Sequence, residues 1–377
     1  MKTFLFLSWR DIRSPKSGGA EVHTHGLMRC FLQEGCRVIH FAPVYESLPT
    51  EEEIDGITYL RQGGIASVIK KARKYYHQHK NEIDYVVDQC NTHRFFTRFW
   101  VPQKKRIFYI HQLTKEIWDI NMKFPLSWIG KHTENAMLRL QRFDWTITVS
   151  ESTRDDLLKV GFQKERIVIV PNAANEEILG LPLPPVSLKL PHTFLYAGRY
   201  SKYKGIDAAI KALGMVKAYC GKVKLHILGK KDEDVIRDMI APLAQEYGFS
   251  YGVSEDCDVV LHGFVSGEEK YQWMRDSYAL LFPSLREGWG IIVTEAAALG
   301  TPSIVYDSPG CRDAVNYGKA GYLCKENTSE ELARLMLNCM QNEAEYSEKR
   351  QSAYDFAQRF SWKENQKIVK AFLESLA

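Results

Sequence analysis

The stretch REGWGIIVTEAAALGTP, residues 286–302, decides the fold of the chain around it. The apolar run LLFPS at 280–284 precedes it and predicts a buried strand, while IIVTEAAAL predicts a helix. A Gly-Trp-Gly turn separates the two, and Gly300 stands where a left-handed helix cap favours glycine. A strand, a glycine turn and a helix in this order predict one repeating unit of an α/β sheet.

The same stretch carries two glutamates that are expected to face one crevice. Glu287 lies on the turn, and Glu295 lies in the second turn of the helix. The first N–H groups of a helix and the positive end of its dipole attract an anion, and a carboxylate accepts hydrogen bonds from vicinal hydroxyls. This predicts a sugar-nucleotide site that includes Gly290 and Ile291, although glutamates near a helix start can also serve the dipole alone.

Outward from this stretch, apolar strands alternate with amphipathic helices in both halves of the chain. Such alternation predicts parallel sheets that are covered on both faces, here two doubly wound, Rossmann-like α/β domains facing a cleft. Five prolines between 171 and 191 disfavour a helix or a central strand. We therefore expect a first domain at 1–175, a linker at 176–191, a second domain at 192–360 and a closing amphipathic helix at 361–377.

Composition bounds the class of protein. The 377 residues are 45% hydrophobic and 25% charged, which is typical of a globular chain of two domains. The run FLFL near the N-terminus is too short for a signal-peptide core, and we find no transmembrane segment. Eight scattered cysteines without a C-x-x-C pair favour a reducing cytoplasm and disfavour a zinc site.

Three further features are expected at the carboxyl ends of strands. Gly18 and Gly19 directly precede a helix start, where a backbone without side chains can approach a phosphate. In YAGRYSKYKG, Gly198 ends a strand, and Arg199 and Lys204 follow in a loop that suits a diphosphate. His111 ends the strand RIFYIH. Each feature alone also fits an ordinary glycine turn, a pair of surface cations or a packed histidine.

The net charge of +4 conceals a basic region at 61–142, which holds 16 Lys and Arg against 6 Asp and Glu. Within it, IASVIKKARKYYHQHK predicts a helix whose apolar face joins Ile65, Val68, Ile69, Ala72 and Tyr76. The cations Lys70, Lys71, Arg73 and Lys74 then follow the flank and the opposite side. They indicate either a solvated helix face or contact with an anionic membrane or acceptor.

Taken together, these motifs resemble glycosyltransferase family 4, the retaining nucleotide-sugar glycosyltransferases with the GT-B fold. The resemblance runs over nearly the whole chain. It is carried by GGAE at 18–21, His111, VSEST at 149–153, PN at 171–172, GR…KG at 198–205, HGFV at 262–265, the two glutamates eight positions apart and FSWKENQK at 360–367.

The resemblance implies a role for each matching residue. Arg199 and Lys204 would bind the donor diphosphate, Glu295 the ribose hydroxyls and Glu287 the hydroxyls of the transferred sugar. Gly19 would approach the phosphate from the first domain, and His111 would line the donor sugar. The backbone around Phe264 and Val265 would contact the base. The resemblance also implies that the C-terminal helix crosses back to the first domain.

We therefore expect a cytoplasmic, metal-independent, retaining glycosyltransferase with no cofactor beyond its donor, a UDP-sugar being favoured over a GDP-sugar. The acceptor is expected to be a glycan or a lipid-linked glycan of cell-surface polysaccharide synthesis, with a possible peripheral membrane contact through 61–142. A sugar-nucleotide epimerase on the same fold and a non-catalytic sugar-nucleotide-binding subunit are the alternatives. No recognition motif supports binding to nucleic acid. Likewise, no P-loop, G-x-S-x-G or H-E-x-x-H motif occurs.

Overall fold

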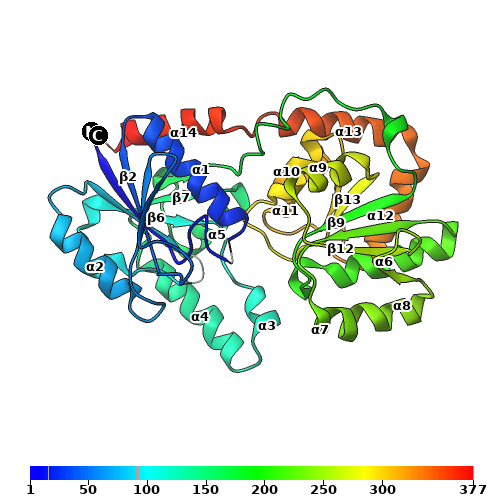
Figure 1. The fold of residues 1–377 in the computed structure, drawn as a ribbon, viewed down its shortest axis with the longest axis horizontal. Helices are drawn as coiled ribbons and strands as arrows, with labels where there is room; N and C mark the ends of the chain where they lie inside the picture. Colours follow the sequence, from blue (N-terminus) through cyan, green and yellow to red (C-terminus); the bar gives the residue numbers. More distant parts are fainter. Residues whose placement is uncertain (16, 91–92, 377) are drawn as a thin grey trace. The chain divides into compact units, whose positions relative to one another are not determined.

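The computed structural model describes residues 1–15, 17–90 and 93–376. The chain divides into two compact units (Figure 1). The first unit comprises residues 1–173 and 362–377, and the second comprises residues 174–361. The predicted return of the C-terminal helix to the first domain is therefore confirmed.

The first unit is built on an eight-stranded sheet with the order β3-β4-β2-β1-β5-β6-β7-β8. All neighbours pair in parallel except β3 and β4, which form an antiparallel edge that the alternation of strands and helices did not predict. The strands are β1 (Thr3–Leu7), β2 (Arg37–Ala42), β3 (Glu51–Ile54), β4 (Ile57–Arg61), β5 (Tyr85–Cys90), β6 (Arg106–Ile110), β7 (Trp145–Thr148) and β8 (Ile167–Ile169).

Helices cover both faces of this sheet because successive side chains of its strands point to opposite faces. Leu5 and Leu7 of β1 pack toward α2, whereas Phe4 and Phe6 pack on Phe31 of α1. The helices are α1 (Gly19–Gln33), α2 (Val68–His79), α3 (Ile117–Asn121), α4 (Leu126–Arg139), α5 (Glu151–Val160) and the returning α14 (Trp362–Ser375).

The contact between α14 and α1 explains a glycine within α1. A Cβ at Gly26 would lie 2.0 Å from the Trp362 ring, so only glycine lets the two helices approach this closely. Phe372 of α14 then packs on Phe31 of α1 and Trp145 of β7. The closing helix is thus part of the first unit's core, beside α1 in Figure 1.

Helix α2 begins later than predicted. Its first residue is Val68, and Ile65 lies outside the helix with 79% of its surface exposed. Val68, Ala72 and Tyr76 are buried against the sheet as expected from their spacing. The predicted place of Ile65 on the same apolar face is therefore wrong, because the chain there turns around Gly63 and Gly64 before the helix starts.

The second unit has a seven-stranded parallel sheet with the order β11-β12-β10-β9-β13-β14-β15. This confirms the predicted second doubly wound domain. The strands are β9 (Thr193–Ala197), β10 (Lys224–Leu228), β11 (Tyr251–Gly252), β12 (Val259–Gly263), β13 (Ala279–Phe282), β14 (Ser303–Val305) and β15 (Tyr322–Leu323).

The helices of the second unit again lie on both faces. α6 and α12 pack on the face formed by Leu225, Ile227 and Leu281, while α9 contributes Trp273, which stacks on His226 of the opposite face. The helices are α6 (Ile206–Cys220), α7 (Glu233–Val235), a π-helical turn at Ile236–Ile240, α8 (Ala241–Tyr247), α9 (Gly267–Asp276), α10 (Ile291–Ala298), α11 (Cys311–Ala314), α12 (Ser329–Gln341) and α13 (Glu343–Ala357).

The proline-rich segment at 176–191, which the sequence analysis assigned to a linker, lies in the second unit. Its backbone carbonyl at Pro184 accepts a hydrogen bond from Arg350 at 2.6 Å. Lys189 is buried and donates to the carbonyl of Arg275 at 2.6 Å. These bonds attach the segment to α13 and to the end of α9.

Candidate functional site

The candidate donor site lies where the strand order of the second sheet changes direction. In this unit the chain starts at β9, places β10, β12 and β11 on one side of it, and places β13, β14 and β15 on the other. In open parallel sheets, ligands bind beyond the carboxyl ends of the strands at this switch point. The loops after β9 and β13 carry the predicted diphosphate cations and the first glutamate, respectively.

Lys204 and Glu287 come together from these two loops as an ion pair. Their side chains are only 19% and 12% exposed. Burial alone would lower the pKa of Lys204, but the Glu287 carboxylate outweighs burial and holds this pKa above its ordinary value. Lys204 is therefore a fixed positive charge that is already in contact with the residue predicted to hold the sugar.

Close backbone packing fixes the two loops against each other. Gly205 has φ +72°, and a Cβ there would lie 2.1 Å from the carbonyl oxygen of Pro283. The N–H of Leu285 also donates to the Tyr203 carbonyl at 2.9 Å. The final glycine of the GR…KG motif is thus required by the neighbouring loop, because any side chain would separate Lys204 from Glu287.

Helix α10 begins directly after this turn, and its N-cap is Gly290, whose φ of 109° is in the left-handed region. The first N–H groups of the helix lack intrahelical acceptors by geometry and form an anion-binding end. Trp289 next to it is buried, and its indole N–H donates to Thr294 at 2.9 Å. Ile291 starts the helix, so the predicted strand, glycine turn and helix are all confirmed.

Glu295 projects from the second turn of α10 and is buried. Lys270 of α9 donates to both of its oxygens at 2.9 and 2.8 Å, and the Tyr271 hydroxyl donates to one of them at 3.3 Å. Burial and the Glu295 charge raise the pKa of Tyr271 to about 12. Lys270 and Tyr271 were not predicted from the sequence, because no spacing rule connects α9 to α10.

The remaining predicted donor-site residues differ in their environments. Arg199 follows Gly198 after β9 and is exposed, while its carbonyl accepts from the Tyr196 hydroxyl at 3.0 Å. Phe264 follows β12 with 87% of its surface exposed, and Val265 is half-buried. The structure therefore brings Lys204 and Glu287 into contact and leaves the Arg199 side chain in solvent.

The first unit presents its own glycine turn after β1. Gly18 is the N-cap of α1, and Gly19 is the first helical residue. The Glu21 carboxylate accepts from the Gly18 N–H at 2.8 Å and pairs with Arg10 at 3.0 Å. The carboxylate of the GGAE motif is thus used within the chain to close the helix start.

His111 follows β6 and is buried beside two other aromatic groups, with its ring 5.4 Å from His23 and 4.8 Å from Tyr109. Burial, and then the neighbouring His23, hold the pKa of His111 well below its usual value. His111 is therefore a neutral imidazole at neutral pH. Thr153, from the VSEST motif, donates to the His111 carbonyl at 3.0 Å and anchors the end of β6.

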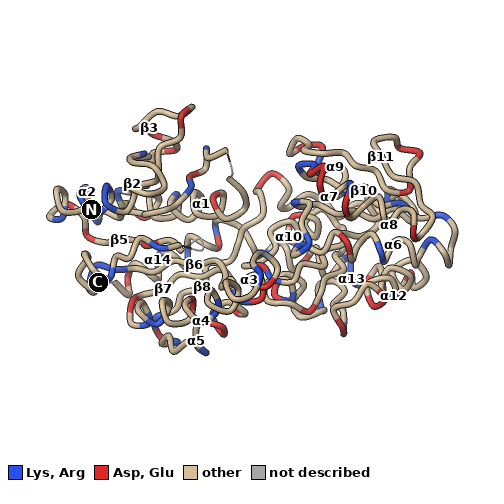
Figure 2. The backbone as a smooth tube through the Cα atoms, turned by 90° about the horizontal axis from the view of Figure 1, so that it is seen from below, with Lys and Arg blue, Asp and Glu red and all other residues tan. Residues whose placement is uncertain are grey.

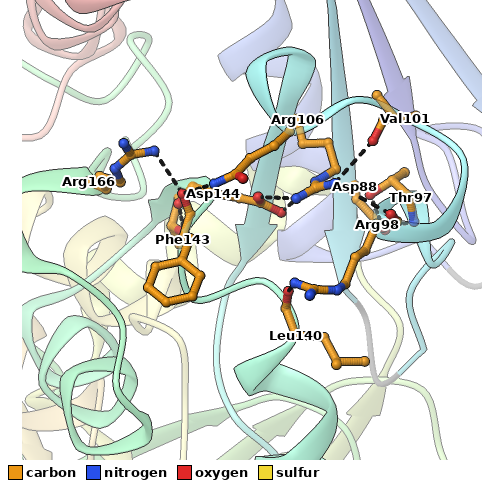
Figure 3. A network of polar contacts seen from close by, with 11 residues as sticks. Asp88, Thr97, Arg98, Val101, Arg106, Leu140, Phe143, Asp144 and Arg166 are labelled. Atoms are coloured by element: carbon orange, nitrogen blue, oxygen red, sulfur yellow. Dashed lines mark hydrogen bonds and ion pairs between the residues drawn. The ribbon is translucent and has the colours of Figure 1, made fainter.

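Several cations of the basic region form ion pairs or hydrogen bonds within the first unit. Arg106 forms a two-point ion pair with Asp144 at 2.8 and 3.0 Å, and Arg98 donates to the Leu140 carbonyl at 2.6 Å (Figure 3). Arg61 is fully buried between Asp11 and Glu52. Part of the positive charge of residues 61–142 therefore serves to hold the first unit together.

Helix α2 carries several cations along its backbone, which are the blue segments near its label in Figure 2. Lys70, Lys71, Arg73 and Lys74 are exposed, and within the described ranges none of them has an ion-pair partner. Across the part of the chain that the structure describes, no helix combines the length and apolarity needed to cross a membrane.

One group of side chains in the described ranges could hold a metal ion. His226, His262 and Glu255 offer ligand atoms within 4.8 Å of one another. The two imidazoles already form a hydrogen bond of 2.8 Å, and Trp273 stacks on His226 and lies tilted against His262. Burial lowers the pKa of His226 to about 4. The trio includes none of the residues predicted for donor binding, and we assign it no part in transfer chemistry.

The structure consists of two doubly wound units. At the carboxyl ends of its strands, the second unit carries a cation, a helix N-terminus and a carboxylate, which suit an anion and hydroxyl groups. This is the class of two-domain α/β proteins with the GT-B fold. Sequence comparison specifies the family. The profile described as "Glycosyl transferases group 1" matches residues 187–360, and that described as "Glycosyltransferase Family 4" matches residues 17–178. The chain belongs to the group 1 glycosyltransferases of family 4.

Curated relatives are glycosyltransferases of several kinds. The amylovoran biosynthesis glycosyltransferase AmsK of Erwinia amylovora is 27% identical over 53% of this chain and 48% of its own length. The phosphatidyl-myo-inositol mannosyltransferase of Mycobacterium leprae is 26% identical over 52% of this chain and 50% of its own. The chain thus spans about half the length of these two relatives.

Solved structures share the fold over the full chain. HepE of Anabaena, solved in complex with UDP and glucose, superposes with a TM-score of 0.71 at 17% identity and covers 100% of both chains. Sucrose-phosphate synthase of Thermosynechococcus elongatus gives a TM-score of 0.77, also at 17% identity, over 100% of this chain and 99% of its own. At these identities the likeness shows the GT-B fold alone.

Proposed function

We propose that this protein transfers a sugar from a nucleotide-diphosphate sugar to a glycan or lipid-linked acceptor with retention of anomeric configuration. The observation that carries the proposal is the Lys204–Glu287 pair beside the start of α10, at the switch point of the second sheet. A cation and a helix N-terminus suit a diphosphate, and a neighbouring carboxylate suits sugar hydroxyls.

Donor binding is proposed to proceed by an exchange of partners. The diphosphate takes the hydrogen bonds of Lys204, which releases the Glu287 carboxylate to accept from hydroxyls of the transferred sugar. Arg199, exposed in the same loop, adds a second cation to the diphosphate. Because leaving-group charge develops during transfer, donors placed in advance lower the barrier by electrostatic stabilisation.

The ribose is proposed to bind at Glu295, with Phe264 and Val265 near the base. In the structure, Lys270 and Tyr271 hold the Glu295 carboxylate in place. Lys270 and Tyr271 use three of the about four acceptor sites of this carboxylate, so one ribose hydroxyl can add directly and a second would replace one of these donors. HepE was solved with UDP, which supports the preference for a UDP-sugar as part of the proposal.

For the first unit, we propose that Gly18, Gly19 and His111 contact the reactants. The neutral state of His111 suits a hydrogen bond to a sugar hydroxyl and does not add a charge near the reacting carbon. The transfer is proposed to need no metal ion and no further cofactor, because Lys204, Arg199 and the α10 N-terminus offset the charge of the diphosphate.

One relative is named for amylovoran biosynthesis and another as a phosphatidyl-myo-inositol mannosyltransferase, which supports a role in cell-surface polysaccharide synthesis as part of the proposal. A peripheral contact of α2 with an anionic membrane is part of the proposal. The test is a thermal-shift screen of UDP, GDP and their sugars, followed by product analysis with and without acceptor. Ligand at 100 times its dissociation constant adds about 2.7 kcal/mol to stability. Sugar-nucleotide turnover without any transferred product would contradict glycosyl transfer.

A further inference from the structure

The first unit contains a cavity of about 820 Å³ that the donor half of the proposed reaction does not use. Its walls come from the loops after β1, β2 and β5 and from the start of α2. The strand order places β1 and β5 side by side at the switch point of this sheet. The cavity therefore occupies the position at which open parallel sheets bind ligands.

The cavity wall is mainly apolar. It is formed by Trp9, Val44, Tyr45, Ile65, Ile69 and Phe96 among others. Phe96 has a backbone φ of +55°, a left-handed conformation that residues other than glycine and asparagine rarely adopt. The Tyr45 hydroxyl donates to the Trp9 carbonyl at 3.0 Å and joins two of the loops. An apolar wall on loops that are fixed in this way is a binding surface and not a buried core.

The cations of this wall already have partners within the chain. Arg94 donates to the Met137 carbonyl at 2.6 Å and to the Gln141 side chain at 2.9 Å. Arg10 pairs with Glu21 at 3.0 Å. A phosphate or a charged sugar in the cavity would have to break these bonds, whereas an apolar group would only displace water.

The mouth of the cavity adjoins the basic helix. Ile65 is 79% exposed, and Ile69 directly precedes Lys70 and Lys71 of α2. An apolar rim followed by exposed cations matches a molecule that has a hydrocarbon chain and lies at an anionic surface. The apolar rim and the adjoining cations of α2 thus favour an aliphatic chain, and not a free sugar, as the molecule that the cavity binds.

We propose that this cavity binds the hydrocarbon chain of an amphiphilic acceptor, so that the acceptor is a glycolipid-like molecule and not a free glycan. This inference rests on the proposed function only in that the bound molecule receives the sugar. Binding of the hydrocarbon chain itself can be measured without transfer. Each methylene that the wall buries adds about 0.8 kcal/mol, which converts to about fourfold in affinity.

The test is calorimetric binding of methyl, hexyl, octyl and decyl β-glucosides below their micelle concentrations to the full-length protein. We expect affinity to rise about fourfold per methylene from hexyl to octyl. Val44→Asp and Ile65→Asp place a charge on the wall at positions 41% and 79% exposed, so folding should persist. Both variants should lose the chain-length dependence and keep UDP affinity. Val253→Asp, at a 74% exposed position of the second unit, is the matched control.

Equal binding of all four glucosides, or an undiminished chain-length dependence in both cavity variants, would overturn the inference. Transfer to methyl glucoside as efficient as to octyl glucoside would also overturn it while leaving the proposed transferase intact. Chain-length-dependent binding without any sugar-nucleotide turnover would instead refute the proposed function and support the cavity.

Discussion

The two halves of the Lys204–Glu287 ion pair should change UDP affinity in opposite directions. In the unliganded protein the ammonium of Lys204 contacts the Glu287 carboxylate. If the diphosphate takes over Lys204, then Glu287 competes with the ligand for the same charge. Removing the lysine removes a ligand contact, whereas removing the charge of the glutamate removes the competitor.

The magnitudes follow from the environment of the pair. A charge-assisted hydrogen bond contributes about 1.5–3 kcal/mol, so Lys204→Met should weaken UDP binding by about 10- to 150-fold. An ion pair at the surface contributes at most about 1 kcal/mol, and this pair, with side chains only 19% and 12% exposed, is screened less by water. Glu287→Gln should therefore tighten UDP binding by about fivefold or more, yet lower turnover with a UDP-sugar because the sugar loses its carboxylate partner.

Isothermal titration with UDP measures both effects, and urea unfolding confirms that each variant is folded. Lys202→Met is the control, because Lys202 is an exposed lysine of the same loop. It should bind UDP within about twofold of the unchanged protein, since an exposed cation contributes little. If Lys204→Met bound UDP as tightly as Lys202→Met does, the exchange of partners would be refuted.

Four further predictions address the other parts of the site and the surface. Glu295→Ala should weaken UDP and UDP-sugar binding alike, because a ribose contact is present before and during transfer; unchanged UDP affinity by titration would remove Glu295 from the ribose. Sugar transfer should persist in EDTA, and a complete loss that only Mg²⁺ or Mn²⁺ restores would contradict the proposed charge balance. Vesicles with anionic lipid should sediment the protein at low salt and release it at high salt, and Lys70→Glu with Lys71→Glu should abolish this; equal recovery on neutral vesicles would leave α2 as a solvated face. Burial lowers the pKa of His23 from 6.5 to about 4, so between these pH values the unfolded chain binds a proton that the folded chain does not. The unfolding free energy should thus fall on acidification, by up to about 3 kcal/mol from this group, and urea titrations of His23→Gln should show a smaller fall.

The order of elements was readable from the sequence because each is specified by nearby residues. The apolar start of LLFPS lies in β13, the Gly-Trp-Gly turn follows it, and IIVTEAAA forms α10, with Gly300 at a positive φ after the helix. Side-chain periodicity and glycine positions act over a few residues, so local sequence is enough to place them. The helix at 65–80 shows the limit, since Gly63 and Gly64 delayed its start and left Ile65 in solvent.

The sequence by itself determined two doubly wound domains and which residues follow the strands at their carboxyl ends, and the family resemblance added the return of the C-terminal helix. Tertiary structure alone decided that Lys204 pairs with Glu287 and that Lys270 and Tyr271 hold Glu295. It also decided that Arg61 and Arg106 form buried ion pairs while Lys70, Lys71, Arg73 and Lys74 of α2 are exposed. The physical reason is that charge pairing and burial depend on distances between elements far apart in the chain, and no periodicity within one element records them.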